Sequence, residues 1–210
     1  DFSAPVTLNG SDISINDRNS LMLELSSNSA IAHAGDDLSV QGQIAGNLST
    51  VAGATIFGQT DVTGNLSVKA NGPVTQNGIL NVAGNTTIDA FNQSIALSQA
   101  NDFGGSVTLN GTDISISDRN SLTVMLSANN GIIQSGDDLS LQGKVFGNLS
   151  TVASATIFGQ TNVAGDLSVK ANGPVMQNGI LNVVGSTTID AFNQPIALSQ
   201  ANDFGGAVTL

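Results

Sequence analysis

The chain of 210 residues carries 16 acidic and 5 basic side chains, which gives a formal net charge of −11, and it contains no cysteine. Five basic residues cannot neutralise a run of phosphates, so the composition argues against nucleic-acid binding and against attraction to an anionic membrane. With 40% apolar and only 10% charged residues the chain does not have the composition of a disordered protein. The absence of cysteine excludes disulfides and thiolate metal sites.

Short runs of alternating apolar and polar residues are the first regular feature along the chain. This alternation has the period of two that is typical of β-strands. The runs are separated by Asn-Gly, Gly-Asp, Gly-Asn and Gly-Gly pairs, which favour turns. No segment has the sustained 3.6-residue apolar stripe and the caps of a helix. The sequence predicts strands in segments such as 107–109, 113–117, 138–141, 166–171 and 187–191.

A long internal repeat organises these runs. Residues 1–109 align without gaps with residues 102–210 at an offset of 101, and 82 of the 109 pairs are identical. We therefore divide the chain into a partial unit over 1–101, a unit over 102–202 and the start of a third over 203–210. Because the chain begins and ends within a unit, we expect it to be part of a longer array.

A shorter period lies inside the long one. Similar segments begin at Val145, Val163, Val183 and Phe204, at intervals of roughly 20 residues. The interval from Phe103 to Val145 leaves room for two more such coils, so that five coils of about 20 residues fill one unit. An immunoglobulin-like sandwich has no such inner period, and it ordinarily uses a Trp and a Tyr that this chain lacks.

The two periods predict an all-β fold, a right-handed parallel β-helix (solenoid) with coils of about 20 residues and about ten coils in all. Residues 1–210 should form one continuous rod. Stacked like charges repel, and the abundance of Asn, Ser, Thr and Gln suits outward ladders better. The turn glycines Gly165 and Gly185 are expected to hold backbone conformations that a Cβ would strain, and if their φ is positive a valine there should be costly. The predicted stack consists of Val145, Leu149, Val163, Leu167, Val183 and Phe204, with Gly147, Gly165, Gly185 and Gly206 at turns.

The segment 165–210, which ends in the motif NDFGGAVTL, resembles the repeat region of filamentous-haemagglutinin-like adhesins, the large exoproteins of bacterial two-partner secretion. The similarity extends over the whole chain and lies in composition, coil length and the NDFGG motif. It implies a right-handed β-helical shaft, export by an outer-membrane transporter partner, an extracellular or cell-surface location on a Gram-negative type of bacterium, and a role in adhesion or biofilm cohesion.

The candidate sites are few. The acidic pairs Asp36-Asp37 and Asp137-Asp138 lie in Gly-Asp-Asp-Leu turns, where carboxylates could bind calcium, but the spacing lacks the known calcium-binding loops. We interpret them as solvated turn residues and predict no metal, cofactor or catalytic site. The pair Asp118-Arg119 repeats Asp17-Arg18, and a feature that recurs in each unit suits a turn or a surface ion pair better than catalysis.

The sequence therefore predicts a structural stalk that supports adhesion or biofilm formation and is not an enzyme. The alternative is a binding module whose Asn/Thr-rich face binds polysaccharide or pairs with another copy, and a polysaccharide-degrading enzyme ranks last. Expected partners are the adjoining repeats of the same chain, a glycan or host surface and further copies, with neither nucleic acid nor membrane insertion. Unpaired rungs at the ends should favour end-to-end association.

Overall fold

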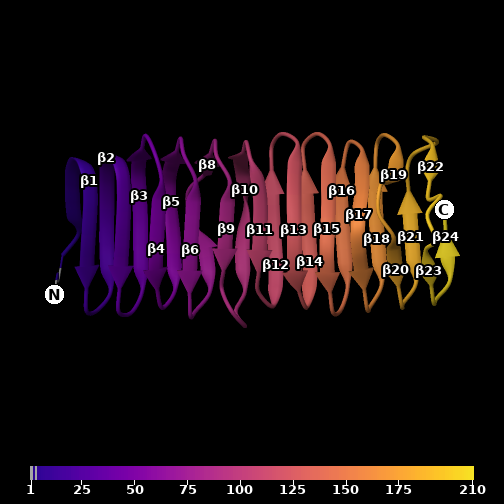
Figure 1. The fold of residues 1–210 in the computed structure, drawn as a ribbon, viewed down its shortest axis with the longest axis horizontal. Coiled ribbons are helices and arrows are strands. Elements are labelled where there is room, and N and C mark those ends of the chain that lie inside the picture. The colour runs from indigo at the N-terminus through magenta and orange to yellow at the C-terminus, as the bar shows by residue number, and fades with distance from the viewer. Residues whose placement is uncertain (1, 3) are drawn as a thin grey trace.

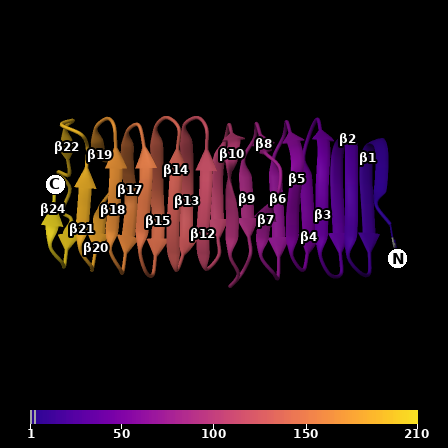
Figure 2. The same cartoon turned by 180° about the vertical axis from the view of Figure 1, so that it is seen from behind.

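The computed structural model describes residues 2 and 4–210, and this part of the chain is all β: its strands stack along one axis, with the chain termini at opposite ends (Figure 1). The same uninterrupted stack is seen from behind in Figure 2. The strands are β1 (Val6–Asp17), β2 (Leu21–Ala34), β3 (Leu38–Ile44), β4 (Leu48–Ala52), β5 (Thr55–Val62), β6 (Leu66–Ala70), β7 (Val74–Gln76), β8 (Leu80–Val82), β9 (Thr86–Asp89), β10 (Ile95–Phe103), β11 (Ser106–Asn110), β12 (Asp113–Asp118), β13 (Leu122–Ala128), β14 (Asn130–Ser135), β15 (Leu139–Val145), β16 (Leu149–Ala153), β17 (Thr156–Val163), β18 (Leu167–Ala171), β19 (Val175–Gln177), β20 (Leu181–Val183), β21 (Thr187–Asp190), β22 (Ile196–Ala197), β23 (Asp203–Phe204) and β24 (Val208–Thr209).

Every pairing between these strands is parallel, and each joins one coil to the next, which confirms the predicted parallel β-helix. In-register partners, one in each coil, can be followed along the rod. They are Leu21, Leu38, Thr55, Val74, Ile95, Ile114, Gly131, Leu149, Leu167, Thr187 and Val208. The coil length varies along this series, and β1 adds one more coil before Leu21. The rod therefore has about eleven coils.

Each coil contributes one stretch of strand to each of two columns, which enclose the core between them. The first column contains the N-terminal halves of β1 and β2 and then β3, β5, β7–β8, β10, β12, β14, β16, β18, β21 and β24. The second contains the C-terminal halves of β1 and β2 and then β4, β6, β9, β11, β13, β15, β17, β19–β20 and β22–β23. Pairing continues from the first unit into the second without a break.

The repeat unit spans five and a half coils, which corrects the expected five. In the in-register series that starts at Leu21, Ile114 lies five coils further along the rod and Gly131 lies six coils further. Leu122, the repeat equivalent of Leu21, lies between these two, in strand β13 of the second column. Equivalent residues of the two units therefore lie in opposite columns of the rod.

The extra half coil lies between Phe103 and Val145. Val145 pairs with Ala128, and Ser127 pairs with Asn110, so a coil here is shorter than the one that joins Val163 to Val183. This stretch therefore holds two and a half short coils where the sequence suggested two long ones. The short coils lack the Val-x-Gly-Asn, Val-x-Gly-Asp or Val-x-Gly-Ser turn that marks the longer coils from Val145 onward, so the inner period is hidden there.

The core is a continuous apolar column of inward-facing Val, Leu, Ile, Ala and Phe side chains. Val145 pairs in register with Val163, Val163 with Val183, and Val183 with Phe204. In the other column Leu149 pairs with Leu167. The side chains of Val145, Leu149, Val163, Leu167 and Val183 are all buried, whereas Phe204 is partly buried against the core. Burial of each such aliphatic side chain stabilises the fold by about 1.5–3 kcal/mol.

Asparagine side chains link successive coils at the turns. Asn47 Oδ1 accepts a hydrogen bond from the backbone N–H of Asn65 (2.8 Å), and Asn65 Oδ1 accepts one from that of Asn85 (2.8 Å). Asn85 Oδ1 in turn accepts from Ser106 N (3.0 Å). The ladder recurs in the second unit through Asn130, Asn148, Asp166 and Ser186. Each side chain satisfies a backbone donor that the turn would otherwise leave unpaired.

The turn glycines are required for a reason other than the one expected. Neither Gly165 nor Gly185 has a positive φ, so the condition on which backbone strain was expected is not met. The coils approach so closely at these turns that a Cβ on Gly165 would lie 2.6 Å from the carbonyl carbon of Gly147 and would overlap the side-chain oxygen of Asn148. Gly147 and Gly206 are crowded in the same way by the coil before them. Inter-coil contact, not backbone strain, selects glycine here.

An inward-facing hydroxyl gives a prediction about stability. Thr156 is fully buried and its Oγ1 has no hydrogen-bond partner in the part of the chain that the structure describes. Thr156→Val removes this unpaired group at nearly constant shape, so we expect the free energy of unfolding to rise by about 1 kcal/mol. Thr161→Val is the matched control and should be destabilising, because Thr161 Oγ1 donates to the carbonyl of Gly159 (3.1 Å). Denaturant melts of both variants measure the difference, and the opposite order would contradict the prediction.

Candidate functional site

A surface hollow recurs once in each unit, at a β-bulge. Gly42 (φ 128°) and its equivalent Gly143 (φ 139°) are the glycines with positive φ in the described chain, and the pairing register shifts by one residue beside each of them. Gly42 lines an open hollow of about 320 Å³ in the first unit, and Gly143 lines one of about 340 Å³ in the second. Because of the half-integral coil number, the two hollows lie on opposite columns of the rod.

The lining of the hollow changes between the units. The first, here called the acidic hollow, is lined by Glu24, Leu25, Ser26, Gly42, Gln43, Gln59 and Asp61. The second, here called the basic hollow, is lined by Thr108, Leu109, Asn110, Met125, Leu126, Ser127, Gly143, Lys144, Gln160 and Asn162. Three of the seven equivalent positions differ, and all three change charge or polarity: Glu24 becomes Met125, Gln43 becomes Lys144 and Asp61 becomes Asn162. The formal charge of the lining therefore changes from −2 to +1.

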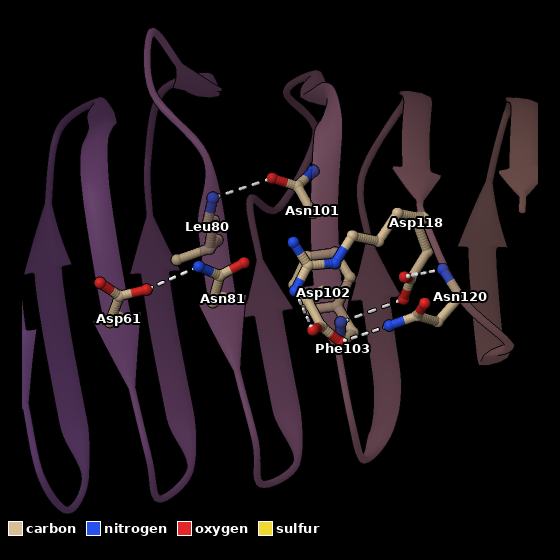
Figure 3. Close-up of polar contacts among 9 residues, drawn as sticks. Asp61, Leu80, Asn81, Asn101, Asp102, Phe103, Asp118 and Asn120 are labelled. Atoms are coloured by element: carbon tan, nitrogen blue, oxygen red, sulfur yellow. Dashed lines mark hydrogen bonds and ion pairs between the residues drawn. The ribbon is translucent and has the colours of Figure 1, made fainter.

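A polar strip continues from the acidic hollow along the first column (Figure 3). Asn81 Nδ2 donates to Asp61 Oδ1 (2.6 Å) from the next coil. One coil further, Asp102 forms an ion pair with Arg119 and accepts a hydrogen bond from Asn120 Nδ2 (3.1 Å). A further open hollow of about 310 Å³, distinct from the acidic and basic hollows, is lined by Asp61, Asn81 and Asp102 along this strip. The strip presents carboxylates and amides to solvent in successive coils.

Asn101, behind this strip, is a structural residue. It is fully buried, and its Oδ1 accepts from the backbone N–H of Leu80 (2.9 Å) (Figure 3). The same oxygen also accepts from Gln76 Nε2 (2.8 Å). Its Nδ2 donates to the carbonyls of Leu97 (3.0 Å) and Ser117 (3.1 Å). The register of β10 with β12 is irregular between Leu97 and Asn101, and this side chain satisfies the backbone groups that the irregularity releases.

Asp118 is buried beside the strip and accepts two backbone hydrogen bonds, from Phe103 N (3.0 Å) and Asn120 N (2.9 Å) (Figure 3). Desolvation is the dominant influence and raises the pKa of this carboxyl above its ordinary value, against the lowering effect of the two donors. In its equivalent, Asp17, the hydrogen bond from the backbone of Phe2 dominates and lowers the pKa. Asp118 has a coil on either side, through Asn101 and Ser135, and is therefore the more desolvated of the two.

These shifts have opposite effects on stability. For Asp118 the cost of burying a carboxylate is present above its raised pKa, so this group makes the fold more stable as the pH falls towards the unfolded pKa of 3.8. For Asp17 the contribution is stabilising above 3.8 and is lost as the pH falls through its lowered pKa. A carboxyl-carbon NMR titration should find Asp118 titrating at the higher pH. The reverse order would contradict the assignment of desolvation as the dominant cause.

The predicted Asp pairs lie apart from the hollows. Asp36, Asp37, Asp137 and Asp138 are exposed at turns between coils. Asp37 Oδ1 accepts a hydrogen bond from the backbone N–H of Ala54 (3.0 Å), which is a turn-capping role. Within residues 2 and 4–210 no group of three or more His, Cys, Asp or Glu side chains is placed to hold a metal ion. The same residues include no helix long and apolar enough to cross a membrane.

The bulge glycines and the hollows were missed by the sequence interpretation. Gly42 lies in LSVQGQI, a run whose alternation looks like an ordinary strand. The available signal was the comparison of the two units, because three of the four substitutions that change formal charge line this hollow.

One family model matches the chain twice, over residues 45–110 and 146–210, which together make up more than half of its length. The starts of the two matched segments are separated by the offset of the internal repeat. Searches of curated proteins and of solved structures found no match. The chain therefore belongs to the family described as repeats of unknown function (DUF5649).

Proposed function

We propose that this chain is a rigid spacer, a segment of the stalk of an extracellular fibrous protein that supports adhesion or biofilm formation. The observation that carries the proposal is the unbroken pairing across the junction of the two units, where β10 pairs with β12 and β11 with β13. A rod without a flexible joint holds whatever lies beyond it at a fixed distance. At ~4.8 Å per coil, eleven coils span about 50 Å and each further unit adds about 26 Å.

The surface hollows and the buried polar groups also support the spacer role. The hollows that line the rod are open and shallow, and the buried polar groups Asn101 and Asp118 are occupied with backbone hydrogen bonds. The resemblance to filamentous-haemagglutinin-like exoproteins agrees with a shaft at the cell surface. In this proposal the location is extracellular and export uses an outer-membrane transporter partner.

An exchange experiment tests the spacer role. In the intact protein, this segment would be replaced by an unrelated β-helical rod of equal length, and in a second strain it would be deleted. We expect adhesion to persist after the exchange and to fall after the deletion, because a spacer acts through its length. Loss of adhesion in the equal-length exchange would contradict the proposal, since it would require a sequence-specific surface on this segment.

The second candidate function is a binding module, and the observation in its favour is the hollow that recurs once per unit. A glycan would meet carboxylates and amides in the acidic hollow but Lys144 and Met125 in the basic one. Saturable binding of a soluble polysaccharide in calorimetry, lost in Gln59→Ala, would favour this role.

A further inference from the structure

The two hollows are complementary to each other in charge. The acidic hollow carries Glu24 and Asp61 and no cation, whereas the basic hollow carries Lys144 and no carboxylate. Lys144 Nζ lies 4.5 Å from the centre of the Phe146 ring, which extends an exposed apolar surface beside the ammonium group. Met125 and Phe146 are 47% and 56% exposed, so both present apolar surface to solvent near Lys144. Their equivalents on the acidic side are Glu24 and the small Ala45.

We infer that the occupant of each hollow is a second copy of this chain, bound side by side. The basic hollow of one rod, with Lys144 and Met125 and with Phe146 beside it, contacts the acidic hollow of its neighbour, with Glu24 and Asp61. Lys144 then gains two carboxylate partners, and the exposed Phe146 and Met125 lose solvent contact against a surface that has a small residue in the equivalent place. This inference concerns the sides of the rod and goes beyond the spacer role, which a non-associating rod would still fulfil.

Because each repeat unit spans five and a half coils, the association between rods is open-ended and does not close into a dimer. Because the two hollows lie on opposite columns, two copies cannot make both contacts with each other at once. The contact is heterologous, and each bound pair leaves one acidic and one basic hollow free. Parallel rods staggered by one unit, about 26 Å at ~4.8 Å per coil, bring the hollows opposite each other. Side-by-side sheets of rods follow, with no closed dimer.

The side-by-side association of two rods is expected to be weak for a segment of this length. Each contact contains one cation and two carboxylates near solvent, and exposed ion pairs contribute little individually. The net charge of −11 on each copy opposes any approach. Association of the 210-residue chain should therefore appear at high protein concentration, and it should strengthen steeply as units are added, because the contacts along two long rods act together.

Charge exchange tests the contact. Sedimentation velocity of the wild-type chain from 0.05 to 1 mM should show a concentration-dependent rise in the weight-average sedimentation coefficient. Lys144→Glu and Glu24→Lys should each abolish at least half of this rise, because each places like charges across the contact. An equimolar mixture of the two variants should restore the rise. In one contact between them, the altered residues at positions 24 and 144 again have opposite charges. In the other contact, the unaltered Lys144 of one variant meets the unaltered Glu24 of the other.

The matched control is Lys69→Glu, which makes the same charge change in the second column away from either hollow. It should keep the wild-type rise. An equal loss in Lys69→Glu, an unaffected Lys144→Glu, or a mixture no more associated than its components would overturn the inference. A wild-type chain that stays monomeric at 1 mM would overturn it too, while leaving the spacer proposal intact.

Discussion

Replacing Gly143 with valine is expected to be one of the most damaging single changes in the chain, with a loss of more than about 3 kcal/mol in the free energy of unfolding. Gly143 has a φ of 139°, a conformation that a β-branched residue strongly resists. A Cβ there would also overlap the backbone carbonyl of Leu126 in the preceding coil. Neither problem can be relieved by a side-chain rotation, since both lie in the backbone.

Two controls separate these effects in denaturant melts. Gly165→Val introduces the inter-coil overlap without a positive φ and should cost less than Gly143→Val. Gly131→Ala should be nearly neutral, because the added Cβ meets only the tips of leucine side chains and because the first unit carries Ala30 at this position. If Gly143→Val were tolerated as well as Gly131→Ala, the positive φ and the close inter-coil contact assigned to Gly143 would be wrong.

Replacing Asn101 with leucine is the second change with a large expected effect, roughly 3 kcal/mol or more, because several buried polar groups lose their partners together. The backbone N–H of Leu80 and the carbonyls of Leu97 and Ser117 would remain in the interior without the side chain that satisfies them. Leucine has a similar volume, so the loss would report on hydrogen bonding more than on packing.

The matched control is Asn202→Leu. Asn202 makes the equivalent bonds, with Leu181 N donating to its Oδ1 (2.9 Å) and its Nδ2 donating to Leu198 O (3.2 Å). It is only partly buried, so water can replace the lost bonds and the cost should be clearly smaller. Equal losses of stability at Asn101 and Asn202 would contradict the assignment of burial as the cause.

The stacking of the second unit could be predicted from sequence because its long coils repeat a recognisable turn. Val145, Val163 and Val183 each stand two residues before a turn glycine, and the structure pairs them in register. The short coils gave no such signal, since β13 and β14 are strands with little turn between them. The stretch of short coils was therefore interpreted as fewer, longer coils, and the extra half coil in the repeat unit was not predicted.

The candidate site was harder to foresee, because it depends on which column each strand joins. Asp118 looks like a surface residue in the sequence Ser-Asp-Arg-Asn, and only the pairing of β12 between β10 and β14 buries it. Glu24 and Asp61 are far apart in the sequence, on β2 and β5, yet both line one hollow. Sequence spacing cannot show this, since the number of residues per coil varies.

The central structural claim is that the repeat unit spans five and a half coils, so that equivalent residues lie in opposite columns. A distance between two spin labels tests this claim most directly. Labels at Ser67 and Ser168, which are repeat equivalents and both exposed, lie in opposite columns, five and a half coils apart. At ~4.8 Å per coil and with the thickness of the rod between them, we expect more than about 30 Å by double electron–electron resonance. Labels at Ser67 and Gln142, four coils apart in one column, provide the scale at about 19 Å. A Ser67–Ser168 distance of about 24 Å, as five whole coils would give, would contradict the half-turn register.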